Sequence, residues 1–193
     1  MVERRIFMKR MIILLTGLFI LCGITVPVNA QQNGKTLIVY FSESGNTRNM
    51  ANIIHELTDG DLVEIEMQTP YSDNYNTLLE EAERDLLANA HPPLRTRIGN
   101  MDEYNTILVG YPNWYAILPM PVFTFLESYN FNGKRIIPFC SHGNGMLGET
   151  VANICKACPG ADVREALSIT YGGGSSLRND IQAWLDKHGL LNY

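Results

Sequence analysis

The sequence predicts an α/β fold in which a five-stranded parallel sheet carries helices on both faces. Short apolar runs alternate along the chain with segments whose apolar residues recur at helical spacing, which is typical of parallel α/β domains. Most of these runs are apolar almost throughout, as strands buried on both faces are. The second run alternates apolar and acidic residues, which suits an edge strand. These patterns agree with the strand order 2-1-3-4-5.

The five expected strands, in chain order, are Lys35–Phe41, Leu62–Met67, Tyr104–Gly110, Arg135–Cys140 and Val163–Ile169. In the second strand, Val63, Ile65 and Met67 are apolar and the residues between them are glutamates. The predicted order places this strand at an edge of the sheet, where it is half exposed. Pro138 is unfavourable in the fourth strand, because a central strand needs its backbone N–H groups for hydrogen bonds.

The expected helices cover residues 50–57, residues 74–90, a segment that begins near Val122, residues 146–158 and residues 176–188. Residues that stop helices follow three of them: Asp59 and Gly60, Pro92 and Pro93, and Pro159 and Gly160. Each predicted strand is therefore followed by a helix, as parallel pairing requires.

Residues 1–30 are expected to be a signal peptide that is cleaved after Ala30. Basic residues between Arg4 and Arg10 precede an apolar stretch centred on Ile12–Ile24, and small residues follow Pro27. If this segment stayed uncleaved, it would anchor the chain in a membrane, and we expect no other membrane association. Residues 31–193 would then form a single domain that is exported, to the periplasm.

The composition is that of a globular protein. Of the 193 residues, 46% are hydrophobic and 18% are charged, which excludes a disordered chain and a multi-span membrane protein. The net charge is −5 and no block of Lys or Arg follows residue 30, so we expect no nucleic-acid partner. We also expect no metal site and no hydrolase, because neither ligand spacing nor a Gly-x-Ser-x-Gly motif is present.

The first candidate binding segment follows the first strand and consists of Ser42, Glu43, Ser44, Gly45, Asn46 and Thr47. Its hydroxyl groups and its glycine lie at the start of a helix, where free backbone N–H groups and the helix dipole favour a phosphate. Hydroxyl groups can donate hydrogen bonds to phosphate oxygens without adding positive charge. The alternative is that Ser44 or Asn46 only caps the helix.

The pattern Ser42-x-Ser44-Gly45-x-Thr47 after an apolar strand resembles the phosphate-binding loop of flavodoxins. The resemblance extends from about Thr36 to Leu190 and implies a flavodoxin-like fold. In flavodoxins, the hydroxyl and amide groups of this loop bind the phosphate of flavin mononucleotide (FMN). The resemblance therefore implies that FMN is the cofactor of this chain.

The second candidate segment follows the third strand and consists of Pro112, Asn113, Trp114, Tyr115 and Ala116. Two neighbouring aromatic residues are unusual in a simple connection, and aromatic rings stack on flat aromatic ligands. The resemblance to flavodoxins implies that Trp114 or Tyr115 contacts the isoalloxazine ring of FMN. We expect the other of these two rings to pack on the helix that follows.

The third candidate segment follows the fourth strand and consists of Ser141, His142, Gly143, Asn144 and Gly145. The resemblance implies that it covers the other edge of the flavin, near N1 and O2. With Gly148 it also matches the dinucleotide fingerprint Gly-x-Gly-x-x-Gly, but that fingerprint belongs after the first strand, where the phosphate loop lies. His142 is a candidate catalytic residue, because it can supply a proton or a positive charge. The alternative is an exposed loop histidine. Outside the first segment, the expected flavin contacts include no carboxylate.

Cys155 and Cys158 form a C-x-x-C motif at the end of a predicted helix. In an oxidising compartment this motif is compatible with a disulfide or a redox pair, and also with two separate thiols. The spacing alone does not decide between these interpretations.

These observations predict an FMN-binding electron-transfer protein. Its partner would be a redox protein or a small quinone-like acceptor. A two-electron quinone-type reductase is one alternative, and a flavodoxin fold that serves as a binding module without flavin is another. Binding of flavin is favoured because all three candidate segments contain suitable residues.

Overall fold

The structure is a computed structural model that describes residues 34–191. The expected signal peptide over residues 1–30 lies outside the described residues and stays a prediction. The strands are β1 (Lys35–Tyr40), β2 (Asp61–Glu64), β3 (Tyr104–Pro112), β4 (Arg135–His142), β5 (Asp162–Val163) and β6 (Leu167–Thr170). They pair in parallel in the order β2-β1-β3-β4-β5, and β6 also pairs with β4. The predicted sheet and its strand order are confirmed.

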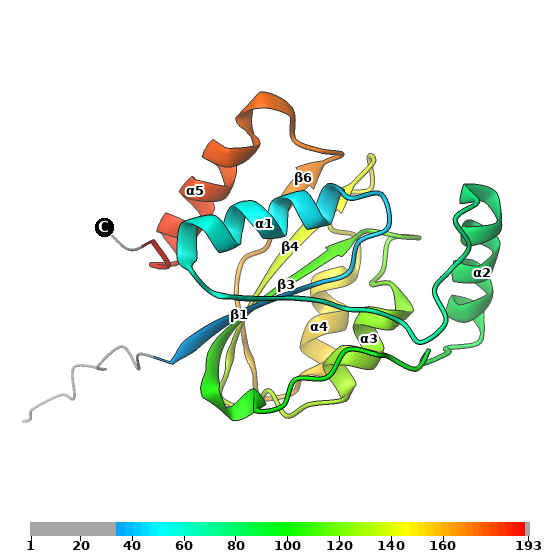
Figure 1. Ribbon diagram of the computed structural model, residues 1–193, viewed down its shortest axis with the longest axis horizontal. Coiled ribbons are helices and arrows are strands. Elements are labelled where there is room, and N and C mark those ends of the chain that lie inside the picture. Colours follow the sequence, from blue (N-terminus) through cyan, green and yellow to red (C-terminus); the bar gives the residue numbers. More distant parts are fainter. Residues whose placement is uncertain (1–33, 192–193) are drawn as a thin grey trace, which may run out of the picture. The chain divides into compact units, whose positions relative to one another are not determined.

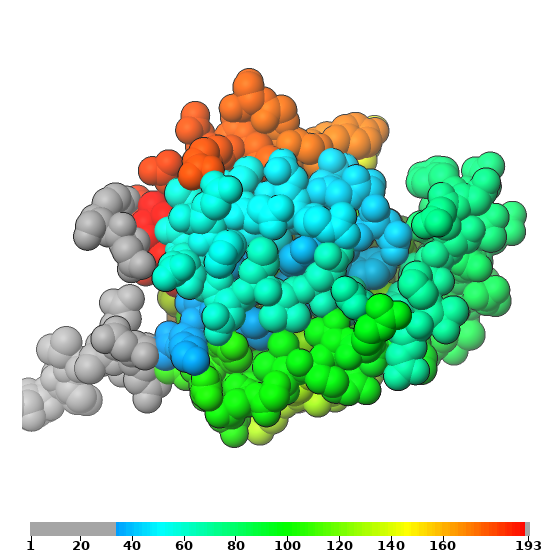
Figure 2. Space-filling model, viewed as in Figure 1, coloured from blue at the N-terminus to red at the C-terminus, as the bar shows by residue number. Residues whose placement is uncertain are grey.

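Helices cover both faces of this sheet. They are α1 (Asn46–Thr58), α2 (Tyr75–Leu87), α3 (Met120–Glu127), α4 (Thr150–Ala157) and α5 (Leu177–Lys187), with short 3-10 turns at Met101–Glu103 and Gly174–Ser176. Helices α1 and α5 pack together on one face, and α3 and α4 pack together on the other (Figure 1). Helix α2 contacts α3 and buries Leu78 and Ala82 in the same hydrophobic core, and in Figure 2 its outer part forms a projection of the surface.

Each face of the sheet has its own hydrophobic core, because neighbouring side chains of a strand point to opposite faces. Ile38 of β1 packs in the core beneath α1 and α5, which includes Ile54. Leu37, the preceding residue, lies in the core beneath α3 and α4, which includes Phe125. All four side chains are fully buried, and burial of each contributes about 1.5–3 kcal/mol to stability.

The last predicted strand is divided into β5 and β6, and this division accommodates Pro138 in a central strand. The carbonyl of Ile136 accepts a hydrogen bond from Arg164 N at 2.8 Å, and that of His142 accepts one from Tyr171 N at 2.6 Å. Even-numbered residues of β4 therefore face the β5–β6 side, and Pro138 is one of them. The backbone nitrogen of Pro138, which carries no hydrogen, faces the interruption between β5 and β6. Within the described residues, no strand pairs with this side of β4 there, so the sheet needs no donor at this position.

Two predicted elements are shorter than expected. The edge strand predicted at Leu62–Met67 is β2, which ends at Glu64. The helix predicted over residues 146–158 begins only at Thr150. Met146 and Gly148 have φ angles of +48° and +51°, which an α-helix does not accommodate. Residues 143–149 therefore form a loop at the carboxyl end of β4.

Candidate functional site

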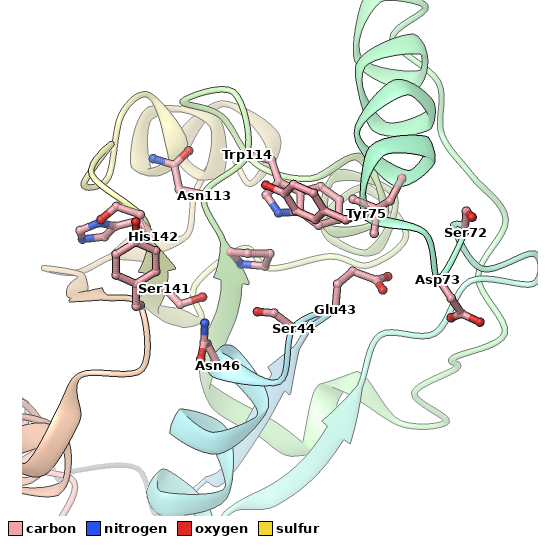
Figure 3. Close-up of a pocket in the computed structure, with 14 residues that line it drawn as sticks. Glu43, Ser44, Asn46, Ser72, Asp73, Tyr75, Asn113, Trp114, Ser141 and His142 are labelled. Atoms are coloured by element: carbon pink, nitrogen blue, oxygen red, sulfur yellow. The ribbon is translucent and has the colours of Figure 1, made fainter.

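A cavity of about 570 Å³ opens at the carboxyl ends of β1, β3 and β4, where ligands bind in open parallel sheets. Its walls come from the carboxyl ends of β3 and β4, from the segments after β1, β3, β4 and β6, and from α2 with the segment that leads into it (Figure 3). The lining residues are Glu43, Ser44, Asn46, Ser72, Asp73, Tyr75, Leu78, Pro112, Asn113, Trp114, Ser141, His142, Gly143 and Tyr171.

All three segments that the sequence indicated meet at this cavity, although some of their residues lie behind its surface. The indicated residues that line it are Glu43, Ser44, Asn46, Pro112, Asn113, Trp114, Ser141, His142 and Gly143. The indicated residues that do not line it are Ser42, Gly45, Thr47, Tyr115, Ala116, Asn144 and Gly145. Several of the residues behind the surface hold the lining residues in place through the contacts described below.

The N-terminus of α1 opens toward the cavity, and its N-cap residue supplies no side-chain hydrogen bond. Gly45 is the N-cap residue, and its φ of +85° is one that glycine adopts without strain. Ser42 Oγ accepts a hydrogen bond from Arg48 N at 3.2 Å, whereas Ser44 and Asn46 line the cavity instead of capping the helix. The N–H groups of Asn46 and Thr47, which precede Arg48 in the first turn, and the side chains of Ser44 and Asn46 are therefore available to an anion.

Thr47 connects the first segment to the third behind the cavity wall. Its Oγ1 lies 2.8 Å from Ser141 Oγ, and both residues are buried. A buried hydroxyl pair of this kind is costly to break, because each group left alone loses its partner without regaining water. The contact fixes the start of α1 against the end of β4.

Trp114 and Tyr115, which the sequence did not distinguish, have different surroundings. Trp114 lines the cavity and packs edge-on against Phe41, with ring centroids 5.5 Å apart, and against Tyr71 at 5.9 Å. Tyr115 is 45% exposed, and its hydroxyl donates to the carbonyl of Leu79 in α2 at 3.0 Å. Trp114 is therefore the ring of the pair that faces the cavity, and Tyr115 contacts the helix before it in the chain.

The turn over Trp114–Ile117 has an unusual backbone for its sequence. Its end residues share a backbone hydrogen bond of 3.0 Å, and Tyr115 and Ala116 between them have φ angles of +53° and +63°. Glycine and asparagine are the usual residues in such two-residue turns. Tyr115 is bonded to Leu79 of α2, and the carbonyl of Ala116 accepts from Glu149 N at 2.7 Å. The strained turn therefore links α2 to the start of α4.

We expect Ala116→Gly to raise the stability of the protein. A left-handed backbone costs a non-glycine residue about 1–2 kcal/mol, which exceeds the roughly 0.4–1 kcal/mol by which glycine stabilises the unfolded chain. Urea denaturation should show a net gain of up to about 1 kcal/mol. Ala51→Gly, in the interior of α1, is the matched control and should lose about 1 kcal/mol. An equal loss of unfolding free energy in the two variants would contradict the proposed backbone strain at Ala116.

His142 ends β4 and is not an exposed loop histidine, so that alternative is wrong. The residue is 8% exposed and borders the cavity. Its Nε2 lies 2.9 Å from Ser168 Oγ on β6, and its Nδ1 lies 3.2 Å from the carbonyl of Gly143. Both ring nitrogens have partners within the protein, so the imidazole is fixed against β6 and the following loop. A catalytic role for it stays a prediction.

The sequence did not indicate five of the cavity residues, namely Ser72, Asp73, Tyr75, Leu78 and Tyr171. Ser72 and Asp73 lead into α2, and Tyr75 and Leu78 lie in its first turn. The one local signal there is Asn74, whose Oδ1 accepts from Asn76 N and Thr77 N and caps the helix. This signal marks where α2 begins, but contacts with remote residues decide where α2 lies.

Two carboxylates line the cavity, although only Glu43 was expected. Asp73 approaches from the α2 side and lines the cavity beside the predicted segments. The prediction that the flavin contacts outside the first segment include no carboxylate stays a prediction. Burial raises the pKa of Glu43 above its ordinary range, Asp73 and Glu64 raise it further, and Arg48 opposes the rise. The charged form of the Glu43 carboxyl is therefore disfavoured in the folded protein, and its pKa is raised.

We expect Glu43→Gln to stabilise the FMN-free protein increasingly as pH rises. Because the folded state holds the Glu43 proton more tightly than the unfolded state, stability is lost as pH rises from the ordinary carboxyl pKa through the raised one. Glutamine removes this loss. Denaturation at pH 4 and pH 7 should show a larger benefit at pH 7. Glu80→Gln, on α2 outside the cavity, makes the same charge change and is the control. If both variants showed the same dependence of stability on pH, the raised pKa of Glu43 would be contradicted.

The C-x-x-C motif and the last glycine of the Gly-x-Gly-x-x-Gly segment do not line the cavity. Cys155 is exposed and Cys158 is buried, and burial raises the pKa of Cys158 to about 12, which does not suit a reactive dithiol. In the Gly-x-Gly-x-x-Gly segment, a Cβ on Gly148 would lie 2.4 Å from the carbonyl oxygen of Ala116. This glycine therefore permits close packing on the Trp114–Ile117 turn.

Within residues 34–191, no helix is both long and apolar enough to cross a membrane. The same part of the chain has no group of three or more His, Cys, Asp or Glu side chains placed to hold a metal ion.

Comparisons with known proteins agree with this architecture. A family model described as flavodoxin matches residues 35–188. A candidate flavoprotein from Bacteroides uniformis is 28% identical, with a TM-score of 0.71, over 79% of this chain and 98% of that chain. Another from Bacteroides eggerthii is 26% identical, with a TM-score of 0.70, over 80% and 98%.

A flavoprotein from Lactobacillus acidophilus, solved in complex with FMN, shares the fold. It is 22% identical, with a TM-score of 0.61, over 78% of this chain and 98% of that chain. A search of curated proteins gives no match. The family match extends over most of the described residues and agrees with the observed strand order. The chain therefore belongs to the flavodoxin family.

Proposed function

We propose that this chain binds FMN noncovalently in the cavity and works as an electron-transfer protein. The observation that carries the proposal is the N-terminus of α1, whose glycine N-cap leaves its first N–H groups open to a cavity that also has the Trp114 ring in its wall. One end of the site thus suits a phosphate and another suits a flat aromatic ring. The flavoprotein from Lactobacillus acidophilus, which was solved in complex with FMN, supports the choice of ligand.

The phosphate would be bound without a basic side chain. None of the residues that line the cavity is Lys or Arg. Backbone N–H groups of the first turn of α1, with Ser44 and Asn46, would donate the hydrogen bonds. Ser42 and Thr47 would support this loop from behind, since both hydroxyls already have partners in the protein.

A buried acceptor beside the cavity also fits a flavin ring. Asn113 Nδ2 donates to the carbonyls of Met146, at 2.7 Å, and Gly145, at 3.3 Å. Asn113 Oδ1 is buried and has no hydrogen-bond partner. A ligand with an N–H group at its ring edge, as the isoalloxazine has, would supply the missing donor after a small shift of the side chain.

When bound, FMN supplies the redox chemistry, and the protein sets its orientation, exposure and electrostatic surroundings. Trp114 and Pro112 would cover one side of the ring, and Ser141 to Gly143 the other. A carrier of single electrons between redox proteins is the function that we propose first. A two-electron reductase is the second candidate, because the α2 segment adds a wall to the cavity and could enclose a small acceptor.

A reductive titration of the FMN-loaded protein, followed by its absorption spectrum, separates these functions. Two resolved one-electron steps would support the carrier. A single two-electron step would support the reductase. A protein that takes up no FMN would contradict both and would favour a binding module without flavin.

We expect FMN to quench the fluorescence of Trp114 much more than that of Trp184. Trp184 lies in α5, packs against Phe139 and donates from Nε1 to the carbonyl of Glu165 at 3.2 Å, away from the cavity. FMN should therefore quench the parent protein strongly and Trp114→Phe only weakly. Equal quenching in the two proteins would remove Trp114 from the flavin site.

A further inference from the structure

The loop between β1 and α1 has two sides, and only one of them faces the cavity proposed for FMN. Ser44 and Asn46 lie on the cavity side (Figure 3). Arg48, in the first turn of α1, is not among the residues that line this cavity. With Ser42 and Glu64 it lines a smaller cavity of about 300 Å³ beside β2. Arg48 therefore lies at the back of the loop, away from the surface that would meet the phosphate.

Glu64 of β2 binds the guanidinium of Arg48 with two hydrogen bonds. Arg48 Nη2 donates to Glu64 Oε1 at 2.5 Å, and Arg48 Nε donates to Glu64 Oε2 at 3.2 Å. Paired hydrogen bonds between a guanidinium and a carboxylate fix the orientation of both groups. Tyr40 of β1, which is buried, donates from its hydroxyl to the same Glu64 Oε2 at 3.1 Å. Tyr40 thus fixes the carboxylate, and the carboxylate fixes the guanidinium.

This network is held from its buried end. Burial, followed by the charge of Glu64, raises the pKa of Tyr40, so its hydroxyl keeps the proton that it donates. The Arg48 side chain is 44% exposed, and exposed ion pairs generally contribute little. A pair with two hydrogen bonds that belongs to a network is the exception. The guanidinium is therefore fixed although water reaches it.

Arg48 contacts the first residue of the loop in two ways. Its backbone N–H donates to Ser42 Oγ at 3.2 Å, and its Nη2 lies 3.5 Å from the carbonyl oxygen of Ser42. Ser42 is buried, whereas Gly45, the N-cap residue, has no side chain that could hold the loop. Asn46 and Thr47, whose N–H groups are available to an anion, lie between these two anchored residues in the chain. The position of Arg48 therefore determines where those N–H groups point.

We propose that Glu64 and Tyr40 are positioning residues for the phosphate site and act through Arg48. Neither lines the cavity, so neither would touch FMN. They hold Arg48 at the back of the loop, which directs the N–H groups of Asn46 and Thr47 toward the phosphate. The preference for a phosphate then comes from the orientation of backbone groups and not from the charge of Arg48. The inference deepens the proposed function and rests on it.

Variants that conserve charge separate position from charge. Arg48→Lys keeps the positive charge, but an ammonium group cannot reproduce the paired hydrogen bonds to Glu64. Glu64→Asp keeps the negative charge on a shorter side chain. FMN and riboflavin, which lacks the phosphate, are titrated separately into the FMN-free form of each variant. We expect each variant to lower the preference for FMN over riboflavin by about fivefold or more, because hydrogen bonds to a charged group weaken when they are misdirected. Riboflavin affinity should stay unchanged.

The ion pair between Arg95 and Glu66 is the matched control. Arg95 Nη1 lies 3.3 Å from Glu66 Oε2, and both residues line the same smaller cavity. Arg95→Lys and Glu66→Asp make the same chemical changes there and should leave the preference for FMN unchanged. Tyr40→Phe removes the hydroxyl that fixes Glu64 without any change in charge, and it should lower the preference. Circular dichroism verifies that each variant folds.

The outcomes separate this inference from the proposed function. A preference that is unchanged or raised in either Arg48→Lys or Glu64→Asp would overturn the inference, and so would an equal loss in the Arg95 and Glu66 controls. In each of these cases the parent protein still prefers FMN to riboflavin, so the proposed function stands. A parent protein that takes up no FMN would overturn the proposed function and this inference with it, before any variant is made.

Discussion

We expect Gly110→Ala to be among the most destabilising single changes in the sheet. Gly110 lies in β3 opposite Phe139 of β4, and a Cβ at this position would lie 2.2–2.9 Å from three atoms of that ring. The Phe139 ring is fully buried and packs against Trp184, so it has little room to move away. Overpacking of a core typically costs 1–3 kcal/mol, and this overlap should cost about 3 kcal/mol or more.

Urea denaturation of the FMN-free protein measures this loss. Gly99→Ala is the matched control, because a Cβ there meets nothing within 4 Å. Phe139→Leu should recover part of the stability of Gly110→Ala, since the smaller side chain vacates the space that the new methyl group needs. If Gly110→Ala were as stable as Gly99→Ala, the packing between β3 and β4 described above would be wrong.

The second large effect concerns the proposed phosphate site. Ser44→Ala and Asn46→Ala each remove a side chain that faces the cavity beside the N-terminus of α1. A hydrogen bond to a charged group contributes about 1.5–3 kcal/mol, so each change should weaken FMN binding by roughly tenfold to a hundredfold. Isothermal titration of the FMN-free variants measures this change, and circular dichroism verifies that they fold.

Thr47→Val provides the contrast. The Thr47 hydroxyl is bonded to Ser141 behind the cavity wall, so its loss should reduce the stability of the fold by about 1–3 kcal/mol and affect FMN affinity less. The opposite result would be that Thr47→Val abolishes FMN binding while Ser44→Ala and Asn46→Ala leave it unchanged. It would contradict the assignment of Ser44 and Asn46, in place of Thr47, as the residues that contact the phosphate.

The part of the site that could be predicted from the sequence is the part that parallel topology brings together. Carboxyl ends of neighbouring strands share one edge of the sheet, so the segments after β1, β3 and β4 had to meet there. The resemblance to flavodoxins then implied a phosphate as the group that the first segment binds. Within each segment, the direction of single side chains could not be predicted. Trp114 and Tyr115 are neighbours of similar character, and only the strained turn directs one to the cavity and the other to α2.

The α2 wall could not be predicted for a different reason. Its placement depends on contacts between residues far apart in the sequence, such as Tyr71 with Trp114 and Tyr115 with Leu79. The helical pattern of α2 says nothing about these contacts. At Pro138 the sequence did carry a local warning, because proline has no backbone N–H group to donate within a central strand. The interruption between β5 and β6 removes the conflict, and no periodicity in the sequence marks that interruption.

The most direct test of the central claim is a titration of the FMN-free protein with FMN and, separately, with riboflavin, which has the same ring system without the phosphate. We expect one FMN per chain. We also expect riboflavin to bind at least about a hundredfold more weakly, because it forgoes two or more hydrogen bonds to a charged group at about 1.5–3 kcal/mol each. No binding of FMN, or equal affinity for the two flavins, would contradict the assignment of the α1 N-terminus as a phosphate site.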